Sequence, residues 1–177
     1  MGLDRLSALY GKLLEGLAWL ACVMVFAMVM MICTDVLLRN VALIPTMRGL
    51  DWSNDLTEAM LWLITMCAAP WILRRGQHIR VDIVLRVIPK HLAWYCEWFA
   101  DVVGLACSLA MVWYGIKVTV ASYTSGAMTV KTMVTPEWWL LAPLPISFAL
   151  LSIEMLFRMR RLAKAERGPR EDAVSAA

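Results

Sequence analysis

Hydrophobic residues along the chain gather into four long runs without a charged side chain. The runs hold 19, 15, 15 and 16 residues and cover positions 16–34, 59–73, 102–116 and 138–153. A helix needs about 20 residues to cross a hydrocarbon core of about 30 Å, so the shorter runs must be extended by apolar flanks and by charged side chains that reach toward the interface. The pattern predicts an all-α integral membrane protein with four transmembrane helices. The predicted spans are about 13–37, 54–74, 92–118 and 136–158.

The segments between the spans carry weaker signals. Residues 82–88 place four aliphatic side chains on one side and Asp82 and Arg86 on the other, which predicts a short amphipathic helix in the interface. Ser53 or Asn54 is expected to cap the second span, and Thr135 with Pro136 to open the fourth. The polar tail at 164–177 is predicted to lie outside a single membrane domain formed by residues 1–163.

The distribution of basic residues predicts the orientation. Thirteen Lys and Arg lie in the two tails and the middle loop, whereas four lie in the other two loops. Because loops rich in Lys and Arg stay in the cytoplasm, both termini are expected to be cytoplasmic. The formal net charge of +3 conceals this asymmetry, since the loop between the first two spans is acidic.

Composition excludes several classes of protein. Hydrophobic residues make up 61% of the chain and charged residues 18%, too apolar a balance for a soluble monomer. A net charge of +3 gives no indication of nucleic-acid binding. The five cysteines form no Cys-x-x-Cys pair, and His78 and His91 lie outside the apolar runs, so a thiol oxidase and a haem protein are both disfavoured. We therefore expect no cofactor, no metal and no catalytic residue.

Acidic residues within the spans lie near the predicted cytoplasmic ends. Glu154 and Arg158 have the i,i+4 spacing of a helix-surface ion pair. Glu97 and Asp101 share this spacing but carry like charges. Two interpretations apply to that pair: a proton or cation site, or two acids neutralised by basic neighbours, which we favour because ionisable groups on a transport path usually lie at the membrane midplane.

A second group of charges lies at the opposite ends of the first two spans. Negative charge at the start of the second helix suits the helix dipole, which is one explanation. The other is an acidic docking surface for an extracytoplasmic partner, steered by complementary charge. The candidate docking residues are Asp35, Arg39, Asp51, Asp55 and Glu58.

One stretch of sequence is specific enough to suggest a family. Trp-x-x-Asp-Leu at 52–56, an apolar span and Arg-Gly-Gln-His-Ile-Arg-Val-Asp at 75–82 resemble the small membrane subunit, the DctQ family, of tripartite ATP-independent periplasmic (TRAP) transporters. Two positions depart from the usual pattern: Ile88-Pro89 replaces Leu-Pro, and Asp55 stands where Glu is commoner. The matching residues are Trp52, Asp55, Leu56, Arg75, Gly76, His78, Ile79, Val81, Asp82, Pro89, Pro136, Trp138 and Pro145.

This resemblance implies a non-catalytic role in an importer of the inner membrane of a bacterium or archaeon. The expected partners are a large membrane subunit (DctM-like), a periplasmic substrate-binding protein (DctP-like) and the lipid bilayer. Uptake of an organic acid would be coupled to a cation, with Na⁺ the expected ion. Gly76 would permit an unusual backbone conformation, and His78 and Asp82 would cap helices.

The sequence is also compatible with two other functions. The chain could be an independent four-helix carrier or channel, or the membrane anchor of a redox complex. The lack of ionisable residues at the centre of the spans disfavours the first. The missing Cys pairs and intramembrane histidines disfavour the second.

Overall fold

A computed structural model describes residues 2–40, 50, 52–76 and 89–164. Within these residues, four helical segments are long and apolar enough to cross a membrane, which confirms the prediction of an all-α integral membrane protein with four spans. They are α1 (Gly2–Asn40), α2 (Ser53–Arg74), α4 (Lys90–Ser125), and α5 (Glu137–Leu141) continued by α6 (Pro143–Lys164). The predicted amphipathic helix at 82–88 and nearly all of the tail lie outside the described residues.

A small β-hairpin joins the third and fourth spans and was not predicted. Strands β1 (Met128–Val130) and β2 (Val134–Pro136) pair antiparallel, after α4 has ended at Gly126 in a left-handed conformation with φ 65°. Glycine adopts this conformation without the steric cost that a Cβ would bring. The chain therefore reverses direction between α4 and α5 through a short paired segment.

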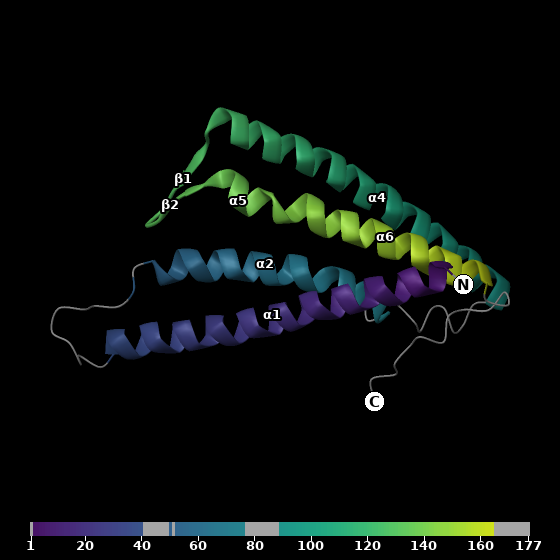
Figure 1. Cartoon of the computed structure of the whole chain (residues 1–177), viewed down its shortest axis with the longest axis horizontal. Helices are drawn as coiled ribbons and strands as arrows, with labels where there is room; N and C mark the ends of the chain where they lie inside the picture. Colours follow the sequence, from purple (N-terminus) through teal and green to yellow (C-terminus); the bar gives the residue numbers. More distant parts are fainter. Residues whose placement is uncertain (1, 41–49, 51, 77–88, 165–177) are drawn as a thin grey trace.

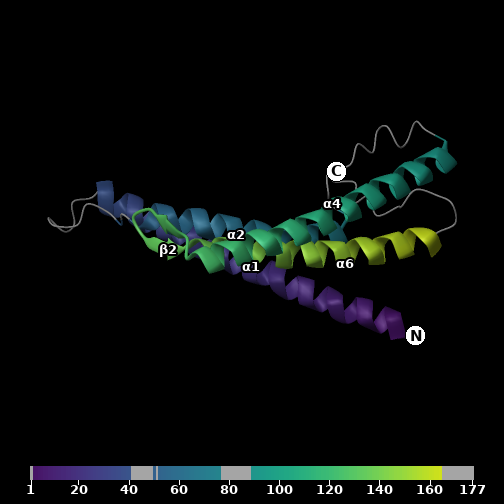
Figure 2. The same cartoon turned by 90° about the horizontal axis from the view of Figure 1, so that it is seen from above.

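The long helices form an open layer. Their main contacts join α1 to α2, α2 to α6 and α6 to α4, and Figure 1 shows the four side by side in that order. Seen from above, the layer is a narrow band that widens where the start of α1 and the start of α4 diverge (Figure 2). We call this end, where α1 begins and α6 ends, the inner end and the opposite end the outer end. The inner end is the one predicted to be cytoplasmic.

Two helices are longer than the spans predicted for them. At 1.5 Å per residue, the 39 residues of α1 extend about 58 Å and the 36 residues of α4 about 54 Å. Both lengths exceed the hydrocarbon thickness of about 30 Å. These helices therefore continue beyond the hydrocarbon core or cross it at a tilt.

Polar side chains are prominent among the buried residues of the layer. The buried apolar side chains include Leu14, Ala21, Pro70, Leu73 and Leu162, whereas four serines on α4 and α6 and several charged residues are also buried. Most large apolar side chains on α1 and α4 are exposed. This distribution suits a protein whose solvent is lipid, because helices in lipid associate through small and polar residues.

Close contact between α4 and α6 depends on glycine. A Cβ added at Gly115 would lie 2.7 Å from Leu144 Cδ2 and 3.3 Å from Pro145 Cδ. A Cβ added at Gly104 would lie 2.8 Å from the end of Met155. Because the proline ring cannot move aside as a methionine can, Gly115 sets the approach of the two helices more strictly.

Side chains of the second and fourth spans donate to backbone carbonyls across the contact between them, and one of these carbonyls lacks its helical donor because of a proline. Pro70 lies inside α2 and has no N–H to donate to the Met66 carbonyl four residues earlier. Ser147 Oγ on α6 donates to that carbonyl at 2.7 Å, and Trp62 Nε1 on α2 donates at 2.8 Å to the Leu140 carbonyl at the end of α5. An unsatisfied carbonyl is costly in lipid, so these bonds stabilise the contact between the second and fourth spans.

Helix starts differ from those expected. Trp52 occupies the N-cap position of α2 and Pro136 that of α5, and neither helix has a side-chain cap bond. Ser53 is the first residue of α2, and Thr135 lies in β2. The predicted caps were therefore wrong, because Ser53 and Asn54 already lie inside α2 and Thr135 pairs with Thr129 in the hairpin.

Candidate functional site

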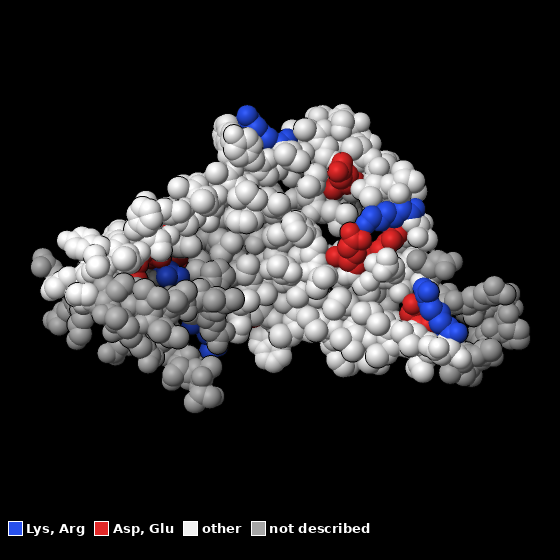
Figure 3. All heavy atoms as spheres, turned by 180° about the vertical axis from the view of Figure 1, so that it is seen from behind, with Lys and Arg blue, Asp and Glu red and all other residues white. Residues whose placement is uncertain are grey.

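Charged side chains lie mainly toward the two ends of the helix layer. Figure 3 shows the centre of one face built from uncharged residues, apart from a basic patch on its upper edge. Among the described residues, no group of three or more His, Cys, Asp or Glu is arranged to hold a metal ion. The features that could carry function are therefore the inner and outer groups of charges and the apolar surface between them.

The inner end contains a compact group of charges that we call the inner cluster. Three of its residues are acids and three are arginines, contributed by α2, α4 and α6 (Figure 1). Arg74, Asp101 and Glu154 each lie directly beyond an uncharged run, which places them at about the same depth. The members are Arg74, Glu97, Asp101, Glu154, Arg158 and Arg161.

Glu154 is the centre of this cluster and is completely buried. Its carboxylate lies 3.0 Å from Arg74 Nη1 on α2 and 2.5 Å from Arg161 Nη2 on α6. Arg74 Nη2 also donates to the Ser7 carbonyl on α1 at 2.8 Å. Two charged side chains thus connect α1, α2 and α6.

Gly11 and Tyr10 complete the attachment of α1. A Cβ added at Gly11 would lie 2.7 Å from Arg74 Nη2, so only glycine leaves room for the guanidinium in its present place. Tyr10 donates from its hydroxyl to the Leu150 carbonyl on α6 at 2.6 Å, and its ring lies 5.7 Å from that of Phe157. The start of α1 is therefore held against both α2 and α6.

Asp101 and Arg158 connect α4 to α6. Arg158 Nε lies 3.1 Å from Asp101 Oδ1, and both side chains are almost fully buried. Glu97, one turn earlier on α4, is also buried. The expected pairing along α6 was Glu154 with Arg158, whereas the structure pairs Glu154 with Arg74 and Arg161 and pairs Arg158 with Asp101. Contacts between packed helices, which spacing along one helix does not reveal, account for this difference.

The acidic residues at the outer end also make internal contacts. Asp35 forms the expected i,i+4 pair with Arg39 at 2.9 Å and accepts a hydrogen bond from the Leu50 N–H at 2.7 Å. Glu58 pairs with Lys131 at 2.5 Å. Asp55 accepts a hydrogen bond from the Met133 N–H at 3.1 Å, so α2 holds the turn of the hairpin through two of its side chains. Asp51, also proposed for docking, lies outside the described residues.

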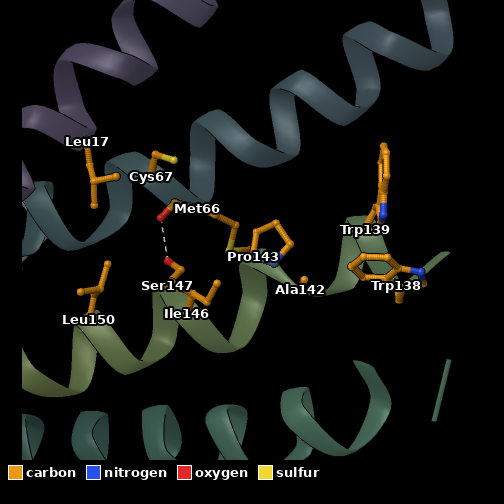
Figure 4. Close-up of a pocket in the computed structure, with 10 residues that line it drawn as sticks. All are labelled: Leu17, Met66, Cys67, Trp138, Trp139, Ala142, Pro143, Ile146, Ser147 and Leu150. Atoms are coloured by element: carbon orange, nitrogen blue, oxygen red, sulfur yellow. Dashed lines mark hydrogen bonds between the residues drawn. The ribbon is translucent and has the colours of Figure 1, made fainter. Parts of the chain in front are cut away.

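An apolar hollow of about 380 Å³ lies between α1, α2 and the fourth span. Figure 4 shows Trp138 and Trp139 at one end and Leu17 and Leu150 at the other, with the Ser147 bond to Met66 between them. No Asp, Glu, Lys, Arg or His is among the described residues that line it. The hollow therefore offers an ion or an organic acid no charged ligand.

The residues of the predicted family pattern lie at the ends of elements. Trp52, Asp55 and Leu56 form the start of α2, and Arg75 lies over the Trp71 ring at 5.0 Å just after it. Gly76 has φ 68°, the kind of conformation expected for it. Pro89 precedes α4, Pro136 precedes α5, and Trp138 and Pro145 lie in the fourth span. His78, Ile79, Val81 and Asp82 fall outside the described residues.

Several structurally important residues were missed by the sequence reasoning. Arg161 was counted only as a tail charge, and Tyr10, Lys131 and Ser147 were given no role. For the hairpin a signal did exist: Gly126 is followed by two short alternations of apolar residues and threonine around Lys131. For the others no local pattern indicates the partner.

Comparison with known families identifies the chain. The family described as "Tripartite ATP-independent periplasmic transporters, DctQ component" matches residues 28–165, more than three-quarters of the sequence. A comparison with curated proteins finds no match. The matched region contains the second, third and fourth spans, the outer part of the first and the whole predicted motif. The chain belongs to the DctQ family and is thus a multi-pass small membrane component of a TRAP transporter.

Proposed function

We propose that the protein braces the large DctM-like subunit of a TRAP importer in the inner membrane of a bacterium or archaeon. The observation that supports this role is the placement of its charges. The inner cluster ties the helices to one another, while the hollow is apolar and the centre of the face in Figure 3 is uncharged. A transport path for an organic acid would need polar ligands near the midplane.

In this role the chain does not itself move the substrate. A DctP-like binding protein delivers an organic acid, and the large subunit carries it inward with Na⁺. Substrate choice resides in those two partners. The exposed apolar side chains of α1 and α4, such as Phe26 and Phe99, are available to the large subunit and to lipid.

Co-purification and reconstitution test the proposal. An affinity-tagged chain, expressed together with a DctM-like large subunit from the same organism, is expected to recover that subunit in a stable complex. In liposomes with the binding protein and a panel of radiolabelled organic acids, we expect uptake by the complex in a Na⁺ gradient and none when choline replaces Na⁺. Liposomes that hold this chain alone are expected to show no uptake.

Other outcomes favour the other functions. Uptake by the chain alone would establish an independent carrier or channel. A haem or quinone absorbance spectrum in the purified complex would indicate a redox anchor. Uptake driven equally well without Na⁺ would leave the bracing role intact but contradict the proposed coupling ion.

We further propose that the acidic residues at the outer end help to dock the binding protein. The Glu58 side chain is 65% exposed although it pairs with Lys131. We expect Glu58→Lys to weaken binding of the DctP-like protein several-fold at low salt, with the difference shrinking as salt screens the charges. Surface plasmon resonance on the reconstituted complex measures this effect.

Exchanging the charges of Glu58 and Lys131 distinguishes an effect on docking from an effect on the attachment of the hairpin. The double variant Glu58→Lys with Lys131→Glu retains an ion pair that holds the hairpin but reverses its polarity. If the proposal is right, binding stays weak in the double variant. If binding returns to the wild-type level, Glu58 acts only through the hairpin and the docking role is contradicted.

A further inference from the structure

The hairpin formed by β1 and β2 has an unusual distribution of side chains. Its register pairs Thr129 with Thr135 on one face, and Val130 with Val134 on the other, where Met128 also lies. The threonines are half-buried, whereas Met128, Val130 and Val134 are 60%, 80% and 63% exposed. A hairpin that has one face in water normally exposes its polar face and covers its apolar face. This hairpin does the reverse.

The turn of the hairpin lies near the outer boundary of the membrane. Lys131 is held by Glu58, and the Met133 N–H by Asp55, and both acids lie within four residues of the uncharged run of α2. Charged side chains at the edge of such a run are typical of the interface between hydrocarbon and water. The turn is therefore at interfacial depth.

The base of the hairpin lies at a similar depth. The Glu137 N–H donates to the Ala127 carbonyl at 3.1 Å, which joins the base to the start of α5. Tyr123 and Trp138 meet edge to face with ring centroids 5.7 Å apart, and the Trp139 ring meets that of Trp138 in the same way. Tyrosine and tryptophan gather at the level of the lipid headgroups. Both ends of the hairpin are thus at the membrane surface.

Charge does not keep the apolar face in water. Lys131 is the only ionisable residue between Gly126 and Pro136, and it is paired with Glu58. Exposed valine and methionine at interfacial depth gain free energy when they leave water for the boundary between headgroups and acyl chains. A lipid surface is therefore the partner that fits both the depth and the chemistry of this face.

We propose that the apolar face of the hairpin inserts into the outer leaflet and acts as a second, interfacial attachment of the protein to the membrane. Met128, Val130 and Val134 enter the region between headgroups and acyl chains, while the threonine face turns toward the protein. The insertion sets the depth of the outer end of the layer. This inference does not depend on the transport role.

Site-directed spin labelling tests the insertion. In a variant whose five native cysteines are replaced by alanine, a single cysteine is introduced by Val130→Cys or, as the matched control on the opposite face, by Thr129→Cys. The labelled chain, with whatever subunit co-purifies, is placed in phosphatidylcholine nanodiscs. Electron paramagnetic resonance then measures collision of each label with oxygen, which partitions into lipid, and with a water-soluble nickel chelate.

We expect the ratio of oxygen to nickel collisions to be several-fold higher at 130 than at 129. A label at Met128→Cys, on the same face as Val130, is expected to give a similarly high ratio. The Met128 variant replaces the Val130 variant if the latter is not monodisperse. Free access of nickel to position 130 would overturn the proposal. Shielding of position 130 from both reagents would also overturn it, because a protein partner would then cover the face in place of lipid.

Discussion

Replacement of Glu154 by glutamine is expected to lower the free energy of unfolding by about 3 kcal/mol, the low end of the cost of breaking a buried ion pair. The carboxylate is fully buried between Arg74 and Arg161. The Arg161 side chain is 46% exposed and can turn to water, whereas that of Arg74 is 22% exposed and is held by Ser7 as well. The variant therefore leaves the Arg74 charge without its counter-ion inside the junction of three helices.

The effect is measured by unfolding the protein in mixed micelles with an increasing mole fraction of a denaturing detergent. Tryptophan fluorescence follows the unfolding. Glu15→Gln is the matched control, because it removes an exposed acid on α1, toward the inner end of the layer. It should change stability by less than about 0.5 kcal/mol. The double variant Glu154→Gln with Arg74→Gln is expected to recover part of the loss, since it removes the stranded charge. Equal stability of the Glu154 and Glu15 variants would contradict the central role of Glu154.

Replacement of Asp101 by asparagine is expected to cost roughly 2 kcal/mol, somewhat less than the usual cost of breaking a buried pair. Arg158 loses the carboxylate 3.1 Å from its Nε, but Glu97 remains as a second buried acid one turn away on α4. The contact between α4 and α6 should weaken, and less large subunit should co-purify. Thermal unfolding and the yield of intact complex measure the two effects.

The same variant decides between the two interpretations of the Glu97 and Asp101 pair. If basic neighbours neutralise these acids, the complex that does assemble should keep its cation-coupled uptake per molecule. A cation site predicts the opposite result, loss of coupling in a complex of normal stability. Asp101→Asn combined with Arg158→Gln is the control, because it removes both charges and should restore much of the stability without restoring a cation site.

The two ends of the layer are held by different kinds of contact. At the inner end, buried ion pairs and the Tyr10 bond connect all four spans. At the outer end, exposed pairs such as Glu58 with Lys131 attach the hairpin to α2. Exposed pairs contribute little stability, whereas buried ones are costly to break. Variants of the inner cluster should therefore affect folding far more than variants at the outer end.

The sequence by itself determined the number of spans and the family. These features depend on local properties: an uncharged run must leave water wherever it is placed, and the motif around Gly76 is read along a continuous stretch. The local i,i+4 pair of Asp35 with Arg39 was predicted correctly for the same reason. Spacing on one helix is enough to bring those two side chains together.

Only the tertiary structure decided which distant residues meet. Arg74 pairs with Glu154, 80 residues later in the sequence, and Tyr10 donates to the Leu150 carbonyl, 140 residues later. Ser147 donates to the carbonyl freed by Pro70, 81 residues earlier. The order of helices in the layer and the rotation of each helix about its axis select these partners. Uncharged runs are apolar on every side and do not encode that rotation, so the choice of partners came from the few polar groups that had to be satisfied inside lipid.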